Sequence, residues 1–280
     1  MNAVRVIPRL DIKGPNLVKG IHLEGLRVLG RPEDFAKFYY ENGADELIFQ
    51  DVVASLYERN SLHDIISKTA KQIFIPITVG GGLRSIDDIK QVLRAGADKV
   101  SINTAAVKDP ELIKQAALRF GSSTIAVAIE AIKQPNGEYL AYIDNGREET
   151  GFEVVKWAQQ IAELGAGEII ITSVDKEGTG EGFDLELIRK VVRAVNIPVI
   201  AHGGAGKSEH VPQAIIDGEA HAVAIASVLH YGLIKKAEFT GTAGEGNFEF
   251  LKSGKLNSKI NACSIHDLKN ALREKGLNTR

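Results

Sequence analysis

Two acidic residues are spaced along the chain in a way that suits acid–base chemistry. Asp11 closes the β-branched run Arg5–Asp11. Glu130 lies near the end of the comparable run Ile125–Ala131. If both runs are strands of one parallel barrel, the two carboxyl groups face each other across one mouth and can divide the roles of general acid and general base. An acidic residue at a single strand end is commonplace, but a symmetric pair favours catalysis.

Two glycine-rich turns have the composition of phosphate-binding loops. Glycine lets a phosphate approach the backbone, where amide N–H groups at the start of the next helix can donate to it. Either turn alone would indicate only a tight strand-to-helix connection. A related pair across one mouth favours a long ligand with a phosphate at each end. The residues that we expect to form these phosphate sites are Gly81, Gly82, Asn103, Thr104, Gly203, Gly204, Ala226 and Ser227.

Three other polar residues stand near these turns. Lys19 lies in the long glycine-containing segment from Lys13 to Arg31 and can steady a substrate anion, although a lone lysine is ordinarily a surface residue. Asp51 and Asp175 come at the ends of two apolar runs, where a carboxylate can bind hydroxyl groups.

Four charged residues begin apolar runs instead of ending them. They are Arg5, Glu46, Lys99 and Glu168, and their charges alternate. In a barrel they would meet at the N-terminal rim and form a closed ring of salt bridges. Charge at that end of a barrel ordinarily means stability.

Predicted strands and helices would position these residues. Short β-branched runs alternate with longer amphipathic runs, which is typical of parallel βαβ units. The predicted strands are Arg5–Asp11, Glu46–Asp51, Ile75–Gly80, Lys99–Asn103, Ile125–Ala131, Glu168–Ser173, Pro198–His202 and Ala222–Ile225. The predicted helices lie near 33–42, 61–71, 85–96, 109–120, 151–165, 184–195, 207–218 and 265–275.

An internal repeat favours a closed barrel over an open doubly wound sheet. Ile75–Gly82 is echoed by Ile197–Gly204, and Gly43–Glu46 is echoed by Gly165–Glu168. Two (βα)₄ halves that are joined remove the free sheet edges that each half alone would leave. We therefore predict a single (β/α)₈ barrel, a TIM barrel, over residues 1–280, with a long insertion at about 231–262 before the last helix.

Composition excludes several classes of function. The chain has 280 residues, a formal net charge of −2 and no long basic run, so nucleic acid and anionic membranes are poor partners. A single cysteine and the absence of a signal-peptide-like or membrane-spanning run predict a cytoplasmic protein. The seven histidines lack ligand spacing and no strand precedes a Gly-x-Gly-x-x-Gly pattern, so we expect neither a metal nor a cofactor.

The motifs at these positions resemble a known family closely. The sequence is similar to the cyclase subunit of imidazole glycerol phosphate synthase, from histidine biosynthesis, over about residues 1–230 and the final helix. The matching stretches are Arg5–Pro8, Leu10–Lys13, Val18–Gly20, Thr78–Arg84, Ala95–Val107, Thr172–Thr179 and Gly203–Lys207.

The resemblance implies specific roles. A glutaminase subunit would dock at the N-terminal rim as a heterodimer partner, with Asp98 in contact with it, and ammonia would pass the four-charge ring into the barrel. At the mouth, ammonia would attack a ribulosyl-formimino carboxamide nucleotide that carries two phosphates, with Asp11 and Glu130 as acid–base catalysts. Lys19, Asp175 and Gly178 would contribute to substrate binding.

Several residues depart from the family pattern on the substrate side. The family has cysteine where this chain has Arg9, aspartate where it has Glu130 and Glu177, and serine where it has His202. Because the rim is unchanged, one alternative is a paralogue that delivers ammonia to another substrate, such as a nucleotide-linked sugar of a surface polysaccharide. Further alternatives are a non-catalytic phosphate-binding subunit that regulates the glutaminase, and the related sugar isomerase of the same pathway.

Overall fold

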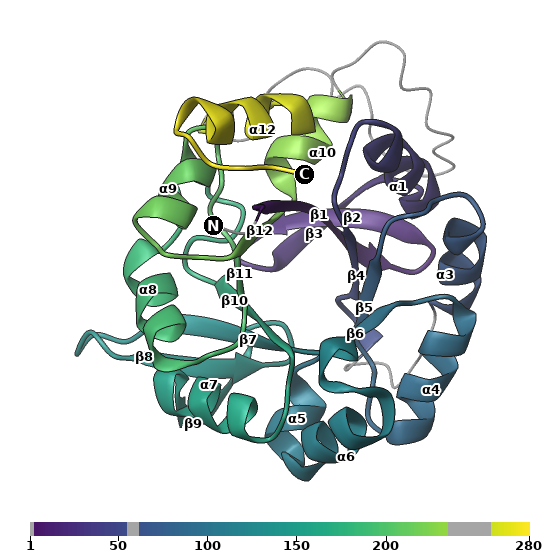
Figure 1. The fold of residues 1–280 in the computed structure, drawn as a ribbon, viewed down its shortest axis with the longest axis vertical. Coiled ribbons are helices and arrows are strands. Elements are labelled where there is room, and N and C mark those ends of the chain that lie inside the picture. The colour runs from purple at the N-terminus through teal and green to yellow at the C-terminus, as the bar shows by residue number, and fades with distance from the viewer. Residues whose placement is uncertain (1–2, 55–61, 235–258) are drawn as a thin grey trace.

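The computed structural model describes residues 3–54, 62–234 and 259–280, and within them eight parallel strands close into a barrel. Figure 1 shows the ring of strands inside a ring of helices. The sheet closes because β1 pairs with both β12 and β4, and because β10 pairs with both β7 and β11. The barrel strands are β1 (Arg5–Lys13), β4 (Leu47–Asp51), β5 (Ile77–Gly80), β6 (Lys99–Ile102), β7 (Ile125–Lys133), β10 (Glu168–Ser173), β11 (Val199–His202) and β12 (Ala222–Ile225). The predicted (β/α)₈ fold is confirmed.

The outer helices begin and end at the sequence signals expected of them. Ser85 and Asp88 form a reciprocal capping box at the start of α4, and Gly96 ends that helix in the left-handed conformation. Ser264 and Asp267 form the same box at the start of α12. The outer helices are α1 (Pro32–Glu41), α3 (His63–Ala70), α4 (Ile86–Ala95), α6 (Glu111–Phe120), α7 (Val154–Glu163), α8 (Leu185–Ala194), α9 (His210–Ile216) and α12 (Ile265–Glu274).

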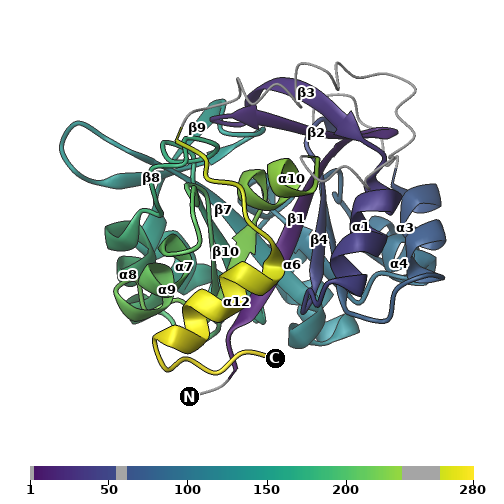
Figure 2. The same ribbon diagram turned by 90° about the horizontal axis from the view of Figure 1, so that it is seen from above.

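Two antiparallel hairpins replace segments that were expected to be a loop and part of a helix. The segment from Lys13 to Arg31 folds as β2 (Asn16–Ile21) and β3 (Glu24–Gly30). After β7, the chain forms β8 (Tyr139–Ile143) and β9 (Glu148–Glu153), so the helix expected from 151 begins at Val154. Figure 2 shows both hairpins at the end of the barrel opposite the two termini. Each (βα)₄ half therefore begins with a barrel strand followed by a hairpin.

Two short helices follow strands at the mouth of the barrel. They are α5 (Thr104–Lys108), after β6, and α10 (Ser227–Ile234), after β12. Tyr231 thus lies in a helix, and residues 235–258 of the predicted insertion lie outside the described residues.

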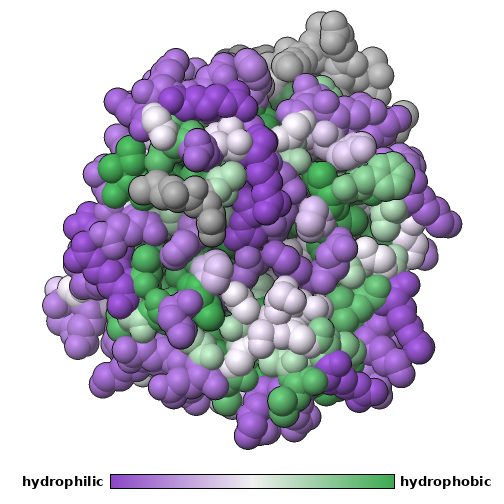
Figure 3. Space-filling view, in the orientation of Figure 1, coloured by the Kyte–Doolittle hydropathy of each residue, from purple (hydrophilic) through white to green (hydrophobic). Residues whose placement is uncertain are grey.

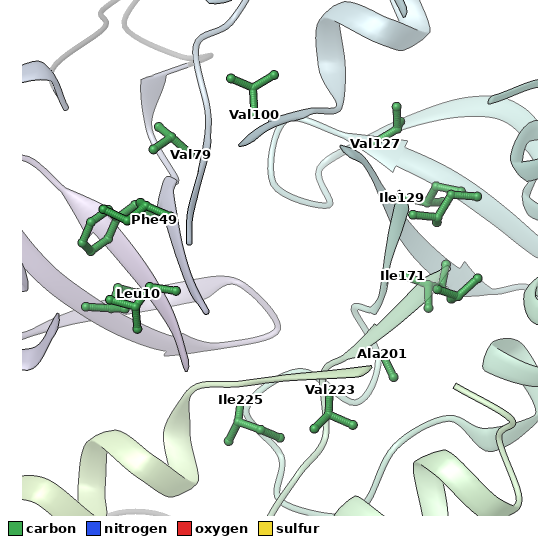
Figure 4. Close-up of a cluster of buried hydrophobic side chains, with 14 of the residues drawn as sticks. Leu10, Phe49, Val79, Val100, Val127, Ile129, Ile171, Ala201, Val223 and Ile225 are labelled. Atoms are coloured by element: carbon green, nitrogen blue, oxygen red, sulfur yellow. The ribbon is translucent and has the colours of Figure 1, made fainter. Parts of the chain in front are cut away.

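Strand alternation decides which side chains face the barrel axis. Figure 4 shows Leu10, Ile129 and Ala201 among the side chains that point outward from the ring toward the helices. Successive residues of a strand point to opposite faces. The neighbours Arg9, Asp11, Glu130 and His202 must therefore face inward. A second, small cluster of buried apolar side chains also comes from the barrel strands and consists of Ile7, Ile48, Ala126, Ala128, Ile170, Ile200, Ala222 and Ala224.

Candidate active site

Asp11 is held by two cations at the C-terminal end of β1. Arg9 Nε donates a hydrogen bond to Asp11 Oδ1 at 2.8 Å. Lys19 Nζ, from β2, lies 3.5 Å from Asp11 Oδ2. Burial by itself would raise the pKa of the Asp11 carboxyl, but the charges of Arg9 and Lys19 hold that pKa well below its usual value. Asp11 is therefore ionised.

Lys19 lies between two carboxylates. Its ammonium forms an ion pair with Glu177 as well as with Asp11, and the Lys19 side chain is 1% exposed. Glu177 Oε2 also accepts a hydrogen bond from Leu23 N at 3.0 Å, and its carbonyl accepts one from His22 N at 2.9 Å. These contacts fasten the first hairpin to the loop after β10. Lys19 is consequently part of the interior, not a surface lysine.

Glu130 sits in the opposite electrostatic environment. Its Oε2 accepts a hydrogen bond from Gly146 N at 2.8 Å. Burial raises the pKa of Glu130 to about 7, although Arg9 and the Gly146 amide pull in the other direction. Two carboxyl groups whose pKa values are pushed apart can serve as an acid and a base at the same pH.

The first predicted phosphate site, which we call the β5–β6 cradle, consists of Gly81, Gly82, Asn103 and Thr104. All four line one cavity of about 950 Å³, counting space open to solvent, together with Glu130. Gly81 adopts a φ of +95°, and a Cβ there would overlap the carbonyl oxygen of Asp51. The backbone at this turn therefore requires glycine.

The second predicted site, the β11–β12 cradle, consists of Gly203, Gly204, Ala226 and Ser227. They line a smaller hollow of about 230 Å³. Gly178 and His202 line the same hollow. The two cradles lie at the carboxyl ends of strands, which is where barrel enzymes build their sites.

The predicted residues differ in how they reach these hollows. Glu130, Asp51 and Arg9 line the larger cavity, whereas Asp11 and Lys19 line neither of the two hollows. Arg9, the hydrogen-bond partner of Asp11, lines the cavity, whereas Asp11 itself does not. Asp175 is exposed, also lies outside both hollows, and accepts a hydrogen bond from Lys133 N at 2.8 Å.

Arg9 and His202 form a contact that the sequence motifs did not predict. Arg9 Nη1 lies 3.3 Å from His202 Nδ1, so a strand of each half-barrel contributes to one pair. Thr172 Oγ1 lies 3.2 Å from the same nitrogen. Burial, reinforced by the charge of Arg9, lowers the pKa of His202 well below its usual value, which makes the ring neutral. Arg9 is two residues before Asp11 on the same strand, so both side chains point to the barrel interior. This spacing is the sequence signal that could have predicted the position of Arg9.

The four-residue ring predicted at the N-terminal rim is present. Arg5 donates to Glu46 and to Glu168 at 2.8 Å each. Lys99 Nζ lies 2.9 Å from Glu168 and 3.4 Å from Glu46, which closes the ring. Figures 1 and 3 view the barrel from the end that carries both termini, and Figure 3 shows hydrophilic residues over the centre of this face.

Asp98 has a local structural contact beside this ring. Its side chain accepts a hydrogen bond from Ile77 N at 2.8 Å, although the residue itself is exposed. No helix in the described part of the chain is long and apolar enough to cross a bilayer. The described residues also hold no group of three or more His, Cys, Asp or Glu side chains arranged for a metal ion.

The fold and the site define a (β/α)₈-barrel protein with two glycine-rich turns that line hollows at one mouth. Residues 5–235 match the family described as histidine biosynthesis protein, and the chain belongs to that family. The resemblance seen in the sequence motifs is thereby confirmed.

Individual relatives agree with the family match. The chain is 60% identical over 209 residues to the imidazole glycerol phosphate synthase subunit HisF of Legionella pneumophila, covering 75% of this chain and 99% of the relative. It is 47% identical over 241 residues to the subunit of the same name from Trichormus variabilis (85% of this chain, 94% of the relative). The corresponding subunit of Thermosynechococcus vestitus is 48% identical over 246 residues (86% and 88%).

Proposed function

We propose that this chain is the cyclase subunit of imidazole glycerol phosphate synthase. It takes ammonia from a partner glutaminase and converts the formimino ribulosyl carboxamide nucleotide to imidazole glycerol phosphate and aminoimidazole carboxamide ribotide, with loss of water. The observation that carries this proposal is the placement of Glu130 and the Asp11–Arg9 pair at one mouth with two anion cradles. The names of the relatives support the same reaction.

The two carboxyl groups have separate roles in this proposal. Glu130 keeps its proton up to about neutral pH because burial raises its pKa to about 7, so it can act as the general acid. Asp11 remains ionised beside Arg9 and Lys19 and acts as the base on the β1 side. The cradles bind the two terminal phosphates, and Gly178, which lines the same hollow as the β11–β12 cradle, contributes to the second of these sites.

The ring at the N-terminal rim is proposed as the entry for ammonia. Arg5, Glu46, Lys99 and Glu168 lie at the opposite end of the strands from the cradles, and the docked glutaminase would cover them and Asp98. Delivery along the barrel axis keeps ammonia unprotonated and at a high effective concentration near the substrate.

The experiment is complementation of a histidine auxotroph that lacks the cyclase. We expect growth with the wild-type chain and with Arg193→Ala, which removes an exposed arginine paired with Glu219. We expect no growth with Asp11→Asn. Failure of the folded wild-type chain to support growth, together with no turnover of the nucleotide, would reject this function.

A second candidate is a paralogue that delivers ammonia to another substrate. The specific observation in its favour is the Arg9–His202 pair at the substrate end of a barrel whose rim ring is complete. This candidate predicts that the chain binds the glutaminase without turning over the histidine-pathway nucleotide. If it neither binds nor activates the glutaminase, the second candidate is rejected as well.

A further inference from the structure

Arg9 occupies the place on the cavity wall that Asp11 was expected to occupy. The Arg9 residue is 4% exposed, and it lines the larger cavity together with Glu130, whereas Asp11 lines neither hollow. A ligand in this cavity would therefore meet a guanidinium group on the β1 side and a carboxyl group on the β7 side.

The guanidinium of Arg9 has hydrogen-bond donors to spare. Arginine carries five N–H donors in a rigid plane. Nε donates to Asp11, and Nη1 contacts His202. Within the described residues, Nη2 makes no hydrogen bond. Nη2 is not fully enclosed by the protein, so an oxygen atom of a ligand in the cavity that Arg9 lines can accept a hydrogen bond from it.

The protein fixes the orientation of Arg9 from several sides. Because an arginine N–H can only donate, His202 Nδ1 accepts, and the ring hydrogen of His202 is on Nε2. The carbonyl of Arg9 is 3.0 Å from His230 Nε2, and His230 Nδ1 is 2.7 Å from Tyr39 Oη. Contacts to α1, α10 and β11 thus hold both the backbone and the side chain of this residue, as pre-organised binding groups require.

The cations Arg9 and Lys19 are balanced by the carboxylates of Asp11 and Glu177, so Arg9 offers a ligand its donor geometry and not an excess of positive charge. Lys19 is compensated by Glu177 and shares Asp11 with Arg9. Glu130, on the opposite wall, can itself donate when it is protonated. The planar guanidinium fork matches a planar pair of acceptor atoms better than a lysine ammonium would.

We propose that Arg9 is a ligand-binding, specificity-determining residue, oriented by Asp11 and His202, that binds a planar oxygen-bearing group of the ligand, a carboxylate or a carboxamide. The phosphate of the same ligand lies in the β5–β6 cradle, which lines the same cavity. This inference deepens the proposed function and rests on it, because the substrate and product of the cyclase reaction carry a carboxamide.

The test measures equilibrium binding by calorimetry, without turnover. The probes are aminoimidazole carboxamide ribotide, its carboxylate counterpart, and ribose 5-phosphate, which has the sugar phosphate but no planar oxygen group. We expect Arg9→Met to lower the affinity for a ribotide by about tenfold and to leave the affinity for ribose 5-phosphate unchanged. A larger loss for the carboxylate ribotide identifies a carboxylate as the group recognised, and an equal or larger loss for the carboxamide identifies that group.

Conservative variants separate binding from folding. Arg9→Lys keeps the charge without the planar fork and should recover only part of the ribotide affinity. His202→Asn keeps an acceptor near the position of Nδ1 and should bind the ribotides like the wild-type chain. His202→Leu has no acceptor there and should lose several-fold in ribotide affinity. Arg193→Ala serves as the control for loss of an arginine elsewhere.

The proposal is overturned if Arg9→Met binds both ribotides as tightly as the wild-type chain does. It is also overturned if Arg9→Met loses as much affinity for ribose 5-phosphate as for the ribotides, or if the wild-type chain binds neither ribotide. A chain that binds the ribotides through Arg9 but does not turn over the cyclase substrate would contradict the proposed function alone.

Discussion

At the scale of single residues, Glu130 shows how burial changes a carboxyl group without a charged partner in contact. The neutral form is favoured in the folded chain because water is excluded, which raises the pKa to about 7. Asp11 is buried more deeply than Glu130, yet two cations reverse the effect. The same residue chemistry thus supplies a proton donor on one wall and a permanent anion near the other.

The raised pKa of Glu130 makes stability depend on pH in a defined direction. The folded chain keeps a proton that the unfolded chain releases between about pH 4.5 and 7, so stability falls as the pH rises through that window. Glu130→Gln removes this penalty and should stabilise the protein on the order of 2 kcal/mol at pH 8, and little at pH 4. Urea unfolding at both pH values checks this, with the exposed Glu148→Gln as control. An equal effect at both pH values would contradict the assignment.

Lys19 is predicted to matter for stability as much as for binding. Lys19→Met leaves Asp11 and Glu177 buried without their shared cation, which should cost about 3 to 5 kcal/mol. Lys37→Met, which breaks an exposed pair with Glu41, should cost less than about 1 kcal/mol. Chemical unfolding measures both. Similar losses would mean that Lys19 is not the compensating charge, and recovery in Lys19→Met with Glu177→Gln would support it.

At the scale of elements, the glycine turns depend on backbone contacts. Gly81 and Gly25 both have positive φ, but a Cβ at Gly81 would overlap the Asp51 carbonyl, whereas a Cβ at Gly25 would meet open space. Gly25→Ala should cost about 1 kcal/mol from strain alone. Gly81→Ala should cost more and should also weaken inorganic phosphate binding several-fold. Thermal unfolding and phosphate titration of both variants check this; unchanged phosphate binding in Gly81→Ala would separate the turn from the anion site.

The barrel strands were predictable because each is a buried β-branched run, and the repeat of Ile75–Gly82 in Ile197–Gly204 predicted closure. The hairpins were not, since β3 and β9 are largely exposed and lack a regular apolar alternation. Helix α10 was missed because it is buried almost all round and shows no helical period.

The candidate site was predictable only in part. Strand ends and glycine turns indicated Glu130 and both cradles. The burial of Lys19 and the contact of Arg9 with His202 depend on which segments meet in space, and local patterns do not report that. Asp175 illustrates the converse, because a residue at a strand end can turn outward and cap a neighbouring backbone amide.

At the scale of the whole molecule, the two ends of the barrel are proposed to handle different chemistry. The rim ring holds four charges in alternating contact, and the mouth holds the cradles. Lys99→Met leaves Glu46 and Glu168 partly unpaired at the proposed ammonia entry. We expect this variant, in complex with the glutaminase, to release more glutamate than imidazole product, while ammonium-dependent turnover is kept.

The ratio of glutamate to imidazole product measures this coupling directly. Lys114→Met, which removes an exposed lysine paired with Glu111 on α6, is the matched control and should keep the ratio near that of the wild-type chain. A ratio that Lys99→Met also leaves unchanged would remove the ring from the path of ammonia.

The most direct measurement of the central claim is turnover of the formimino ribulosyl nucleotide with ammonium as the nitrogen source. We predict that the wild-type chain forms both imidazole glycerol phosphate and the carboxamide ribotide. Asp11→Asn and Glu130→Gln should each lose about 100-fold or more in kcat while still folding. No product from the folded wild-type chain, or full activity in both variants, would contradict acid–base catalysis at this barrel mouth.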